Sequence, residues 1–135
     1  MNKENSIKID EKLLPKVNQI KSAGLPVHAV KLNGKQYIYR GINRKEFRDL
    51  QGEMAKLADA IRTEHKANEA KQNAELALLK EKGEETLVLH CIVDPVIQNI
   101  LDIDQLPAGA ITKLADLIMK VSGFDDAEPE ESLQL

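Results

Sequence analysis

The chain has 135 residues, the size of a single domain, and its composition excludes several classes of protein. One cysteine, Cys91, excludes an internal disulfide and is typical of a reducing compartment. No apolar run approaches the ~20 residues that span a bilayer, and the polar N-terminus does not resemble a signal peptide. We therefore expect a cytoplasmic protein that has no membrane partner.

The charge is divided unevenly along the chain, and the aromatic content indicates the fold class. The net charge of −3 is divided unevenly: residues 1–50 carry eleven Lys/Arg and five Asp/Glu, and residues 51–135 carry eight and seventeen. Aromatic residues make up only 3% of the chain, so the core must be built from Leu, Ile, Val and Ala, which favours helices over an all-β sandwich. We predict a mainly α fold, a small helical domain with one β-hairpin and one long polar helix.

Residues 1–26 are predicted to form an N-terminal arm with a short helix. Asp10 is a suitable N-cap, and Gly24 follows the expected end of the helix. The apolar positions fall at helical spacing: Leu13, Leu14, Val17 and Ile20. This stripe is expected either to join the core or to dock on another subunit, which leaves a homo-oligomer open.

Residues 28–40 are predicted to form a β-hairpin, the first part of a helical domain spanning 27–124. Two short alternating runs flank Asn33-Gly34, the sequence that favours a type I′ turn. A lone hairpin is marginally stable, so one face must pack on helices or pair with a neighbour's strand. Tyr37, Tyr39 and Arg40 form an aromatic and basic ribbon, and we interpret them as candidate protein-interaction residues. Without a wider basic patch they are weak evidence for nucleic-acid binding.

A long helix is predicted over 43–82. Asn43 can cap it, and Glu46 can reach back in a capping box. An apolar seam follows at Phe47, Leu50, Met54, Leu57 and Ile61. Beyond Ile61 the helix propensity stays high, but the large apolar residues give way to alanines.

The alanines of this polar stretch form a small-residue edge. They include Ala67, Ala70, Ala74 and Ala77. Such a helix has little core of its own, so it projects from the domain, pairs with another helix, or becomes ordered on binding. We interpret these four alanines as further candidate protein-interaction residues.

Core helices are predicted over 84–122. The run Leu87–Val93 is almost wholly apolar, and we favour a helix because Asp94-Pro95 stops it and its neighbours are helical. Cys91 is interpreted as a buried structural residue, since a metal site would need further His or Cys at suitable spacing. A short helix is expected over 96–101.

The last predicted helix follows Pro107, which suits a first turn. Its buried stripe is expected at Ile111, Leu114, Ala115, Ile118 and Val121. Gly123 can close the helix in the left-handed conformation, with Phe124 folding back towards Met119. Residues 125–135 are acidic and are predicted to be a solvated tail.

Motifs of catalysis are missing from the sequence. It has no phosphate-cradling Gly-rich loop, no nucleophile elbow and no zinc-ligand spacing. We therefore expect a protein that is not an enzyme and that has no catalytic, metal or cofactor-binding residues.

Four segments, taken in order, resemble the small tail-assembly chaperone and baseplate-associated proteins of contractile-tailed bacteriophages. The matching segments are Tyr39-Arg40 followed by RKEFRDL at 44–50, EETLVLHCIVDP at 84–95, LPAG at 106–109 and SGF at 122–124. The resemblance implies a small helical domain in which the motif residues are structural. Those residues are Cys91, Pro95, Leu106, Pro107, Ala108, Gly109, Ser122, Gly123 and Phe124.

The resemblance also implies a function, that of an assembly chaperone in the host cytoplasm. Such a chaperone binds tail components, typically the tape-measure protein, and keeps them soluble while the tube polymerises. Two other functions remain open: a structural subunit of the baseplate or virion tail, and a nucleic-acid-binding regulator that uses the basic N-terminal half. The overall acidity makes nucleic acid the weaker partner.

Overall fold

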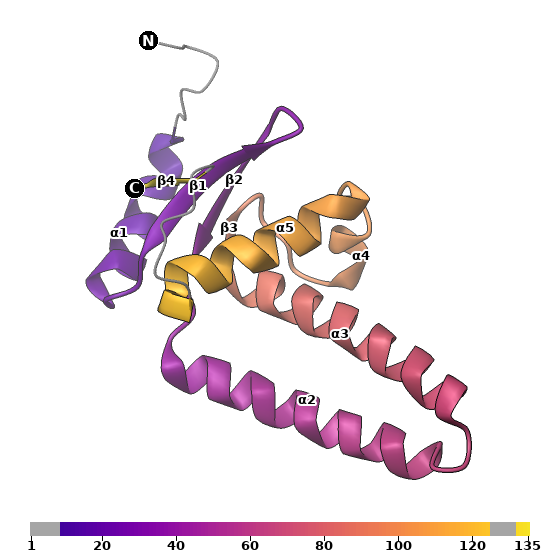
Figure 1. The fold of residues 1–135 in the computed structure, drawn as a ribbon. Helices are drawn as coiled ribbons and strands as arrows, with labels where there is room; N and C mark the ends of the chain where they lie inside the picture. Colours follow the sequence, from indigo (N-terminus) through magenta and orange to yellow (C-terminus); the bar gives the residue numbers. More distant parts are fainter. Residues whose placement is uncertain (1–8, 125–131) are drawn as a thin grey trace.

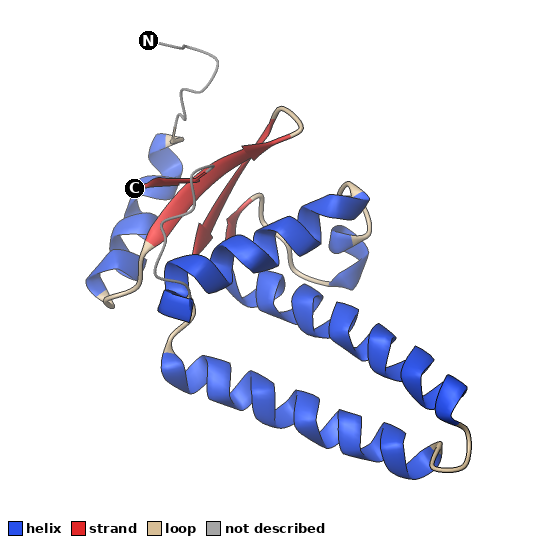
Figure 2. Ribbon diagram, in the orientation of Figure 1, coloured by secondary structure: helices blue, strands red, loops and turns tan. Residues whose placement is uncertain are grey.

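The computed structural model describes residues 9–124 and 132–135 of the chain. The described residues are mainly helical and include a small antiparallel sheet, which confirms the predicted fold class (Figures 1 and 2). The elements in chain order are η2 (Glu11–Leu13), α1 (Leu14–Ser22), β1 (Val27–Leu32), β2 (Lys35–Arg40), α2 (Arg44–Glu64), α3 (Glu69–Cys91), β3 (Ile92–Asp94), α4 (Ile100–Ile103), α5 (Ala108–Met119), η3 (Lys120–Phe124) and β4 (Ser132–Gln134).

The sheet has the strand order β3-β2-β1-β4, and each neighbouring pair is antiparallel. The predicted hairpin is confirmed as β1 and β2. Its turn residues Asn33 and Gly34 have φ angles of 52° and 80°. Positive φ at both central positions is the type I′ geometry that the Asn-Gly pair favours.

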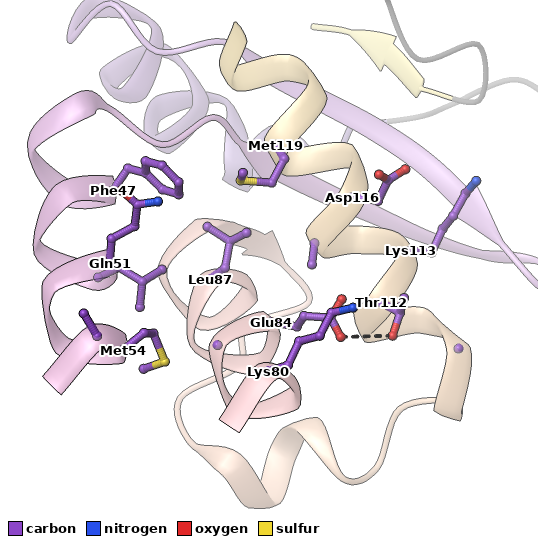
Figure 3. Close-up of a pocket in the computed structure, with 15 residues that line it drawn as sticks. Phe47, Gln51, Met54, Lys80, Glu84, Leu87, Thr112, Lys113, Asp116 and Met119 are labelled. Carbon is purple, nitrogen blue, oxygen red and sulfur yellow. Dashed lines mark hydrogen bonds between the residues drawn. The ribbon is translucent and has the colours of Figure 1, made fainter. Parts of the chain in front are cut away.

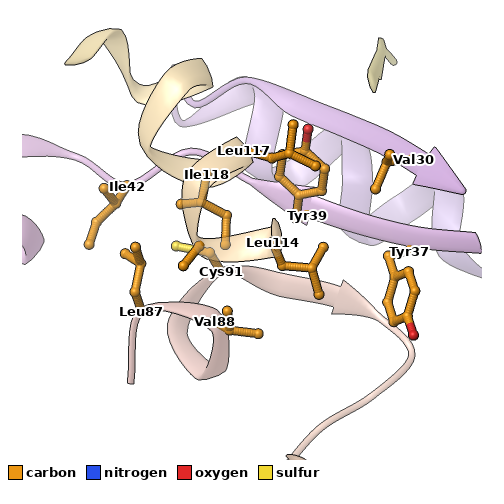
Figure 4. Close-up of a cluster of buried hydrophobic side chains, with 11 residues drawn as sticks. Val30, Tyr37, Tyr39, Ile42, Leu87, Val88, Cys91, Leu114, Leu117 and Ile118 are labelled. Carbon is orange, nitrogen blue, oxygen red and sulfur yellow. The ribbon is translucent and has the colours of Figure 1, made fainter. Parts of the chain in front are cut away.

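The two faces of the sheet carry two separate hydrophobic clusters. Helix α1 covers one face, where Val17 packs with Val27, Ala29, Ile38 and Val93. The apolar stripe of the N-terminal helix therefore belongs to the core. Helix α5 and the end of α3 cover the other face (Figures 1 and 4), with a cluster made of Val30, Tyr37, Tyr39, Ile42, Leu87, Val88, Cys91, Leu114, Ala115, Leu117 and Ile118.

The prediction of one helix over 43–82 is wrong. Helix α2 ends at Glu64, the chain reverses, and α3 begins at Glu69 and lies antiparallel to α2 (Figure 1). The Asn68 side chain caps α3 by accepting a hydrogen bond from the Lys71 N–H at 3.1 Å. Helix α3 then runs through Gly83 into the core, so the core helices do not begin at residue 84.

Two shorter segments also differ from the sequence-based predictions. The helix predicted over Leu87–Val93 ends at Cys91, and β3 follows as the partner of β2. The short helix expected over 96–101 begins later in the structure, as α4 at Ile100–Ile103. The Asn99 side chain accepts a hydrogen bond from the Leu101 N–H at 2.9 Å and so caps this later start.

The predicted solvated tail falls partly outside the described residues, at 125–131. The prediction is wrong for Ser132–Gln134, which form β4. This strand pairs with β1, and the Leu135 N–H donates to the Val27 carbonyl at 2.8 Å. The edge of β1 leaves backbone groups without partners, and β4 satisfies them.

Candidate protein-binding groove

Helix α2 is amphipathic, yet none of its residues is buried. Phe47, Leu50 and Met54 are half-buried, and Leu57 is 39% exposed. Helix α5, in contrast, buries five residues against the sheet and α3. The apolar seam of α2 therefore faces a space that the described part of the chain does not fill.

That space is an open groove between α2, α3 and α5 with a volume of about 1200 Å³ (Figure 3). Its apolar wall comes from all three helices, with Phe47, Leu50 and Met54 on α2, Leu87 on α3 and Met119 on α5. Four further hollows share lining residues with it. One reaches Ile42 and Phe124 at the start of α2, and another follows Ala58, Leu76 and Leu79 between α2 and α3. The other two share Leu50 or Glu84 with the groove and are lined by several carboxylates.

The start of α2 is fixed by charged and capping contacts. Arg40 makes two hydrogen bonds to the Glu46 carboxylate, at 3.0 Å and 2.9 Å. These bonds hold the pKa of the Glu46 carboxyl below its ordinary value, against the opposing effect of its partial burial. Asn43 and Glu46 also form the predicted capping box, which is confirmed.

A second contact joins α2 to the end of α5. The Ser122 hydroxyl accepts from the Ile42 N–H at 2.8 Å and donates to the Ile118 carbonyl at 2.6 Å. Gly123 has φ 94°, the left-handed conformation expected after the helix. The Phe124 ring packs edge-on against Phe47 with centroids 4.4 Å apart, a contact with α2 that the sequence did not predict.

The hairpin residues predicted to bind a partner are not on the surface. Tyr37 and Tyr39 are fully buried beneath α5 and the end of α3 (Figure 4). Their face of the hairpin is the one that packs on the helices, so the prediction of an interaction surface there is wrong. Arg40 is half-buried and bound to Glu46, and it positions α2.

The four predicted alanines lie on or beside α3, and all are exposed. Ala67 is in the turn before the helix, and Ala70, Ala74 and Ala77 follow on its first half. None of them lines the groove between α2, α3 and α5. Their role as an interaction edge therefore remains a separate prediction.

Several of the motif residues lie in the packed core or beside the groove. Cys91 is fully buried, and burial raises the pKa of its thiol to about 12, so it is a poor nucleophile. Pro107 directly precedes α5, one residue earlier than a first-turn position. Leu106 packs against the main cluster, and Gly109 lines the groove.

Three residues that line the groove belong to the apolar seam predicted from the sequence: Phe47, Leu50 and Met54. The sequence analysis did not predict that this seam lines an open groove, and one signal could have revealed it. The seam extends to Leu57 and Ile61, but the stretch that returns beside it offers mainly alanine and polar residues. A seam with more apolar surface than its partner can cover indicates an open face.

Comparisons with known proteins identify no relative: no family model, no curated protein and no solved structure matches the chain. Within residues 9–124 and 132–135, no three His, Cys, Asp or Glu side chains gather as metal ligands. The helices in those ranges also include none long and apolar enough to cross a bilayer.

Proposed function

We propose that this chain is a non-enzymatic assembly chaperone of a contractile phage tail, and that its groove binds an amphipathic helix of a tail component such as the tape-measure protein. One observation carries the proposal. An amphipathic helix of 21 residues, α2, has no buried residue, and its apolar side lines an open groove. The resemblance of the segments at 39–50, 84–95, 106–109 and 122–124 to phage chaperones supplies the biological context.

The groove suits helix-in-groove recognition, in which a partner buries its apolar face between two supporting helices. A helix of 21 residues is about 30 Å long at 1.5 Å per residue, enough for a partner helix of similar length. The bound helix would cover Phe47, Leu50 and Met54, and its own apolar face would leave water at about 25 cal/mol per Å². Removing that face from solvent is what keeps an aggregation-prone partner soluble.

The first experiment measures where the chain is found. Quantitative mass spectrometry compares purified particles with the lysate of infected cells. A chaperone is expected in the lysate and absent from particles. A stoichiometric amount in particles would contradict the chaperone function and support the alternative of a virion subunit.

The second experiment tests the groove itself. Leu50→Gln with Met54→Gln places polar groups on the apolar wall and is expected to abolish co-purification of the tail component. Leu78→Gln is the matched control, because Leu78 is 59% exposed and lies outside the groove. Circular dichroism checks that each variant keeps its helices. Equal co-purification by both variants would contradict the proposed site.

A further inference from the structure

The outer edge of β1 is occupied by β4, a strand from the other end of the chain (Figure 1). The pairing is antiparallel and places Leu133 opposite Ala29. The Leu135 N–H extends the pairing by donating to the Val27 carbonyl at 2.8 Å. A segment far away in the sequence therefore completes the sheet by adding one strand, and strand addition is also a common way for a sheet to bind an extended peptide of a partner.

The two leucines of this segment belong to the face of the sheet that α1 covers. Val27 and Ala29 are part of the hydrophobic cluster under α1, and Leu135 packs against that cluster. Side chains alternate between the two faces along a strand, so Leu133 lies on the same face as Leu135. The edge of β1 therefore favours an extended segment with apolar side chains at alternate positions.

The pairing of β4 with β1 is less extensive than that of the hairpin. Strand β4 pairs through three residues, whereas β1 and β2 pair through six. Leu133 is 52% exposed and Gln134 is also exposed, which leaves Leu135 as the half-buried side chain of this segment. A short and exposed pairing opens at a lower free energy than a long and buried one, so β4 can leave β1 while the hairpin stays intact.

We propose that the edge of β1 is a strand-addition site for an extended, leucine-bearing segment of a partner protein, and that β4 is its displaceable occupant within the chain. The partner pairs with the backbone of residues 27–30 and places leucines where Leu133 and Leu135 now lie. Because β4 belongs to the same chain, it competes with the partner at a high effective concentration. This inference is independent of the helix-binding groove, because no residue of β1 lines that groove.

Hydrogen exchange in the unmodified chain tests whether β4 opens by itself. The N–H and C=O groups of an antiparallel strand point alternately to its two neighbours. The Val27 carbonyl points to β4, so the Ala29 N–H does so too. The N–H groups of His28 and Val30 then point to β2. The Ala29 amide should therefore exchange about tenfold or more faster than these two, as measured by NMR. Equal protection of all three amides would overturn the proposal, because β4 would then open only together with the hairpin.

Proline variants of the full chain open the site. Leu133→Pro with Leu135→Pro removes the two N–H groups that face β1, and with them both leucines. Ser132→Pro with Gln134→Pro is the matched control, because the N–H groups of these residues face away from β1, where an edge strand tolerates proline. Circular dichroism and thermal unfolding follow the fold of each variant. Loss of cooperative unfolding in the first variant would show that the domain requires β4, which also overturns the proposal.

Binding is measured by NMR titration with a synthetic peptide of sequence EESLQL, that of residues 130–135. A site that is open in about one molecule in ten binds a partner about tenfold more weakly. The peptide should therefore bind the Leu133→Pro, Leu135→Pro variant about tenfold or more tightly than the unmodified chain, and it should shift the amides of residues 27–30. The control variant should bind like the unmodified chain. A peptide with both leucines replaced by Gln should bind much more weakly.

Each titration result has one meaning. Absence of binding to the folded, opened variant would overturn the strand-addition site. Equal binding to the opened variant and to the unmodified chain would overturn the role of β4 as its occupant. Equal binding of the two peptides would overturn the preference for leucine.

Discussion

Small residues set the junction between α2 and α5. The Ser122 hydroxyl is bonded to the backbone of Ile42 at 2.8 Å, and Gly41 lies directly before this contact. A Cβ atom on Gly41 would be 2.9 Å from the Pro26 Cγ and 3.2 Å from the Ser122 Oγ. The Ile42–Ser122 bond ties the segment that precedes α2 to the turn after α5, beside the hollow at the start of α2.

The first residue-scale prediction concerns this junction. Gly41→Ala is expected to lower the free energy of unfolding by about 1–3 kcal/mol, because the added methyl overpacks a rigid proline ring. Chemical denaturation measures the change. Gly52→Ala is the matched control, since a Cβ there meets nothing within 4 Å and the site is inside α2. The control should raise the free energy of unfolding by about 0.5–1 kcal/mol, because Ala has a higher helix propensity than Gly. A loss of stability in Gly52→Ala equal to that in Gly41→Ala would contradict the packing argument.

The second residue-scale prediction concerns the Arg40–Glu46 pair. Glu46 has a pKa below its ordinary value, so its ion pair stabilises the fold above about pH 4 and this contribution is lost as the pH falls through the lowered pKa. Glu46→Gln keeps a capping residue but removes the charge. The substitution is expected to lower the free energy of unfolding by about 1–2 kcal/mol at pH 7, and by much less at pH 3.

Denaturation at several pH values measures this difference, and Asp49→Asn is the control. The Lys45–Asp49 pair is largely exposed, with side-chain exposures of 84% and 67%, so its removal should have no measurable effect. A cost of Glu46→Gln that does not change with pH would show that packing, rather than charge, is what Glu46 contributes.

At the scale of elements, the sequence predicted the turns and the helix ends, but it did not predict which strands pair. The Asn33-Gly34 turn, the Asn43 cap and the end at Gly123 depend on residues within one or two turns. Strands β3 and β4 have only three residues each and exist because β2 and β1 offer unpaired edges. No local pattern encodes such an edge, so both were missed.

The candidate site was missed for a related reason. Periodicity identified Phe47, Leu50 and Met54 as one face of a helix, but it could not say whether another element covers that face. The same limit applied to Tyr37 and Tyr39, whose place on the hairpin was predicted while their burial under α5 was not. Sequence alternation assigns residues to faces; tertiary packing decides which face meets solvent.

The element-scale prediction follows from the exposure of α2. Its amide protons are expected to exchange through openings of lower free energy than those of α5, because α2 has no buried residue and α5 has five. Hydrogen exchange followed by mass spectrometry or NMR measures both helices in one experiment. An amphipathic helical peptide bound in the groove should slow exchange in α2 more than in α1. Equal protection of α2 and α5 in the free protein would contradict this account.

At the scale of the whole molecule, the chain divides into a packed part and a projecting one. The sheet, α1, the end of α3, α4, α5 and the segment before α2 hold the buried residues described by the structure, and none of these lies between Ile42 and Leu87. The α2–α3 hairpin extends from this packed part (Figure 1). The outer turns of the hairpin therefore contribute little to global stability, and their surface is available for binding.

This division predicts that the hairpin can be shortened without unfolding the domain. Deleting 58–64 together with 69–75 removes seven residues from each helix, retains the 65–68 turn, and keeps the facing residues in register. The midpoint of thermal unfolding should shift by no more than a few degrees, as expected for a change of about 1 kcal/mol.

Binding separates the two surfaces of the hairpin in the same variant. The deletion removes Ala70 and Ala74 but retains Phe47, Leu50, Met54 and Lys80. If the groove is the binding site, the shortened chain keeps weakened binding to an amphipathic helical peptide, because part of the adjoining hollow is lost. If the alanine edge is the site, binding falls much further while the fold remains, because two of the four alanines are gone. Loss of cooperative unfolding in the variant would instead show that the hairpin supports the packed part of the molecule.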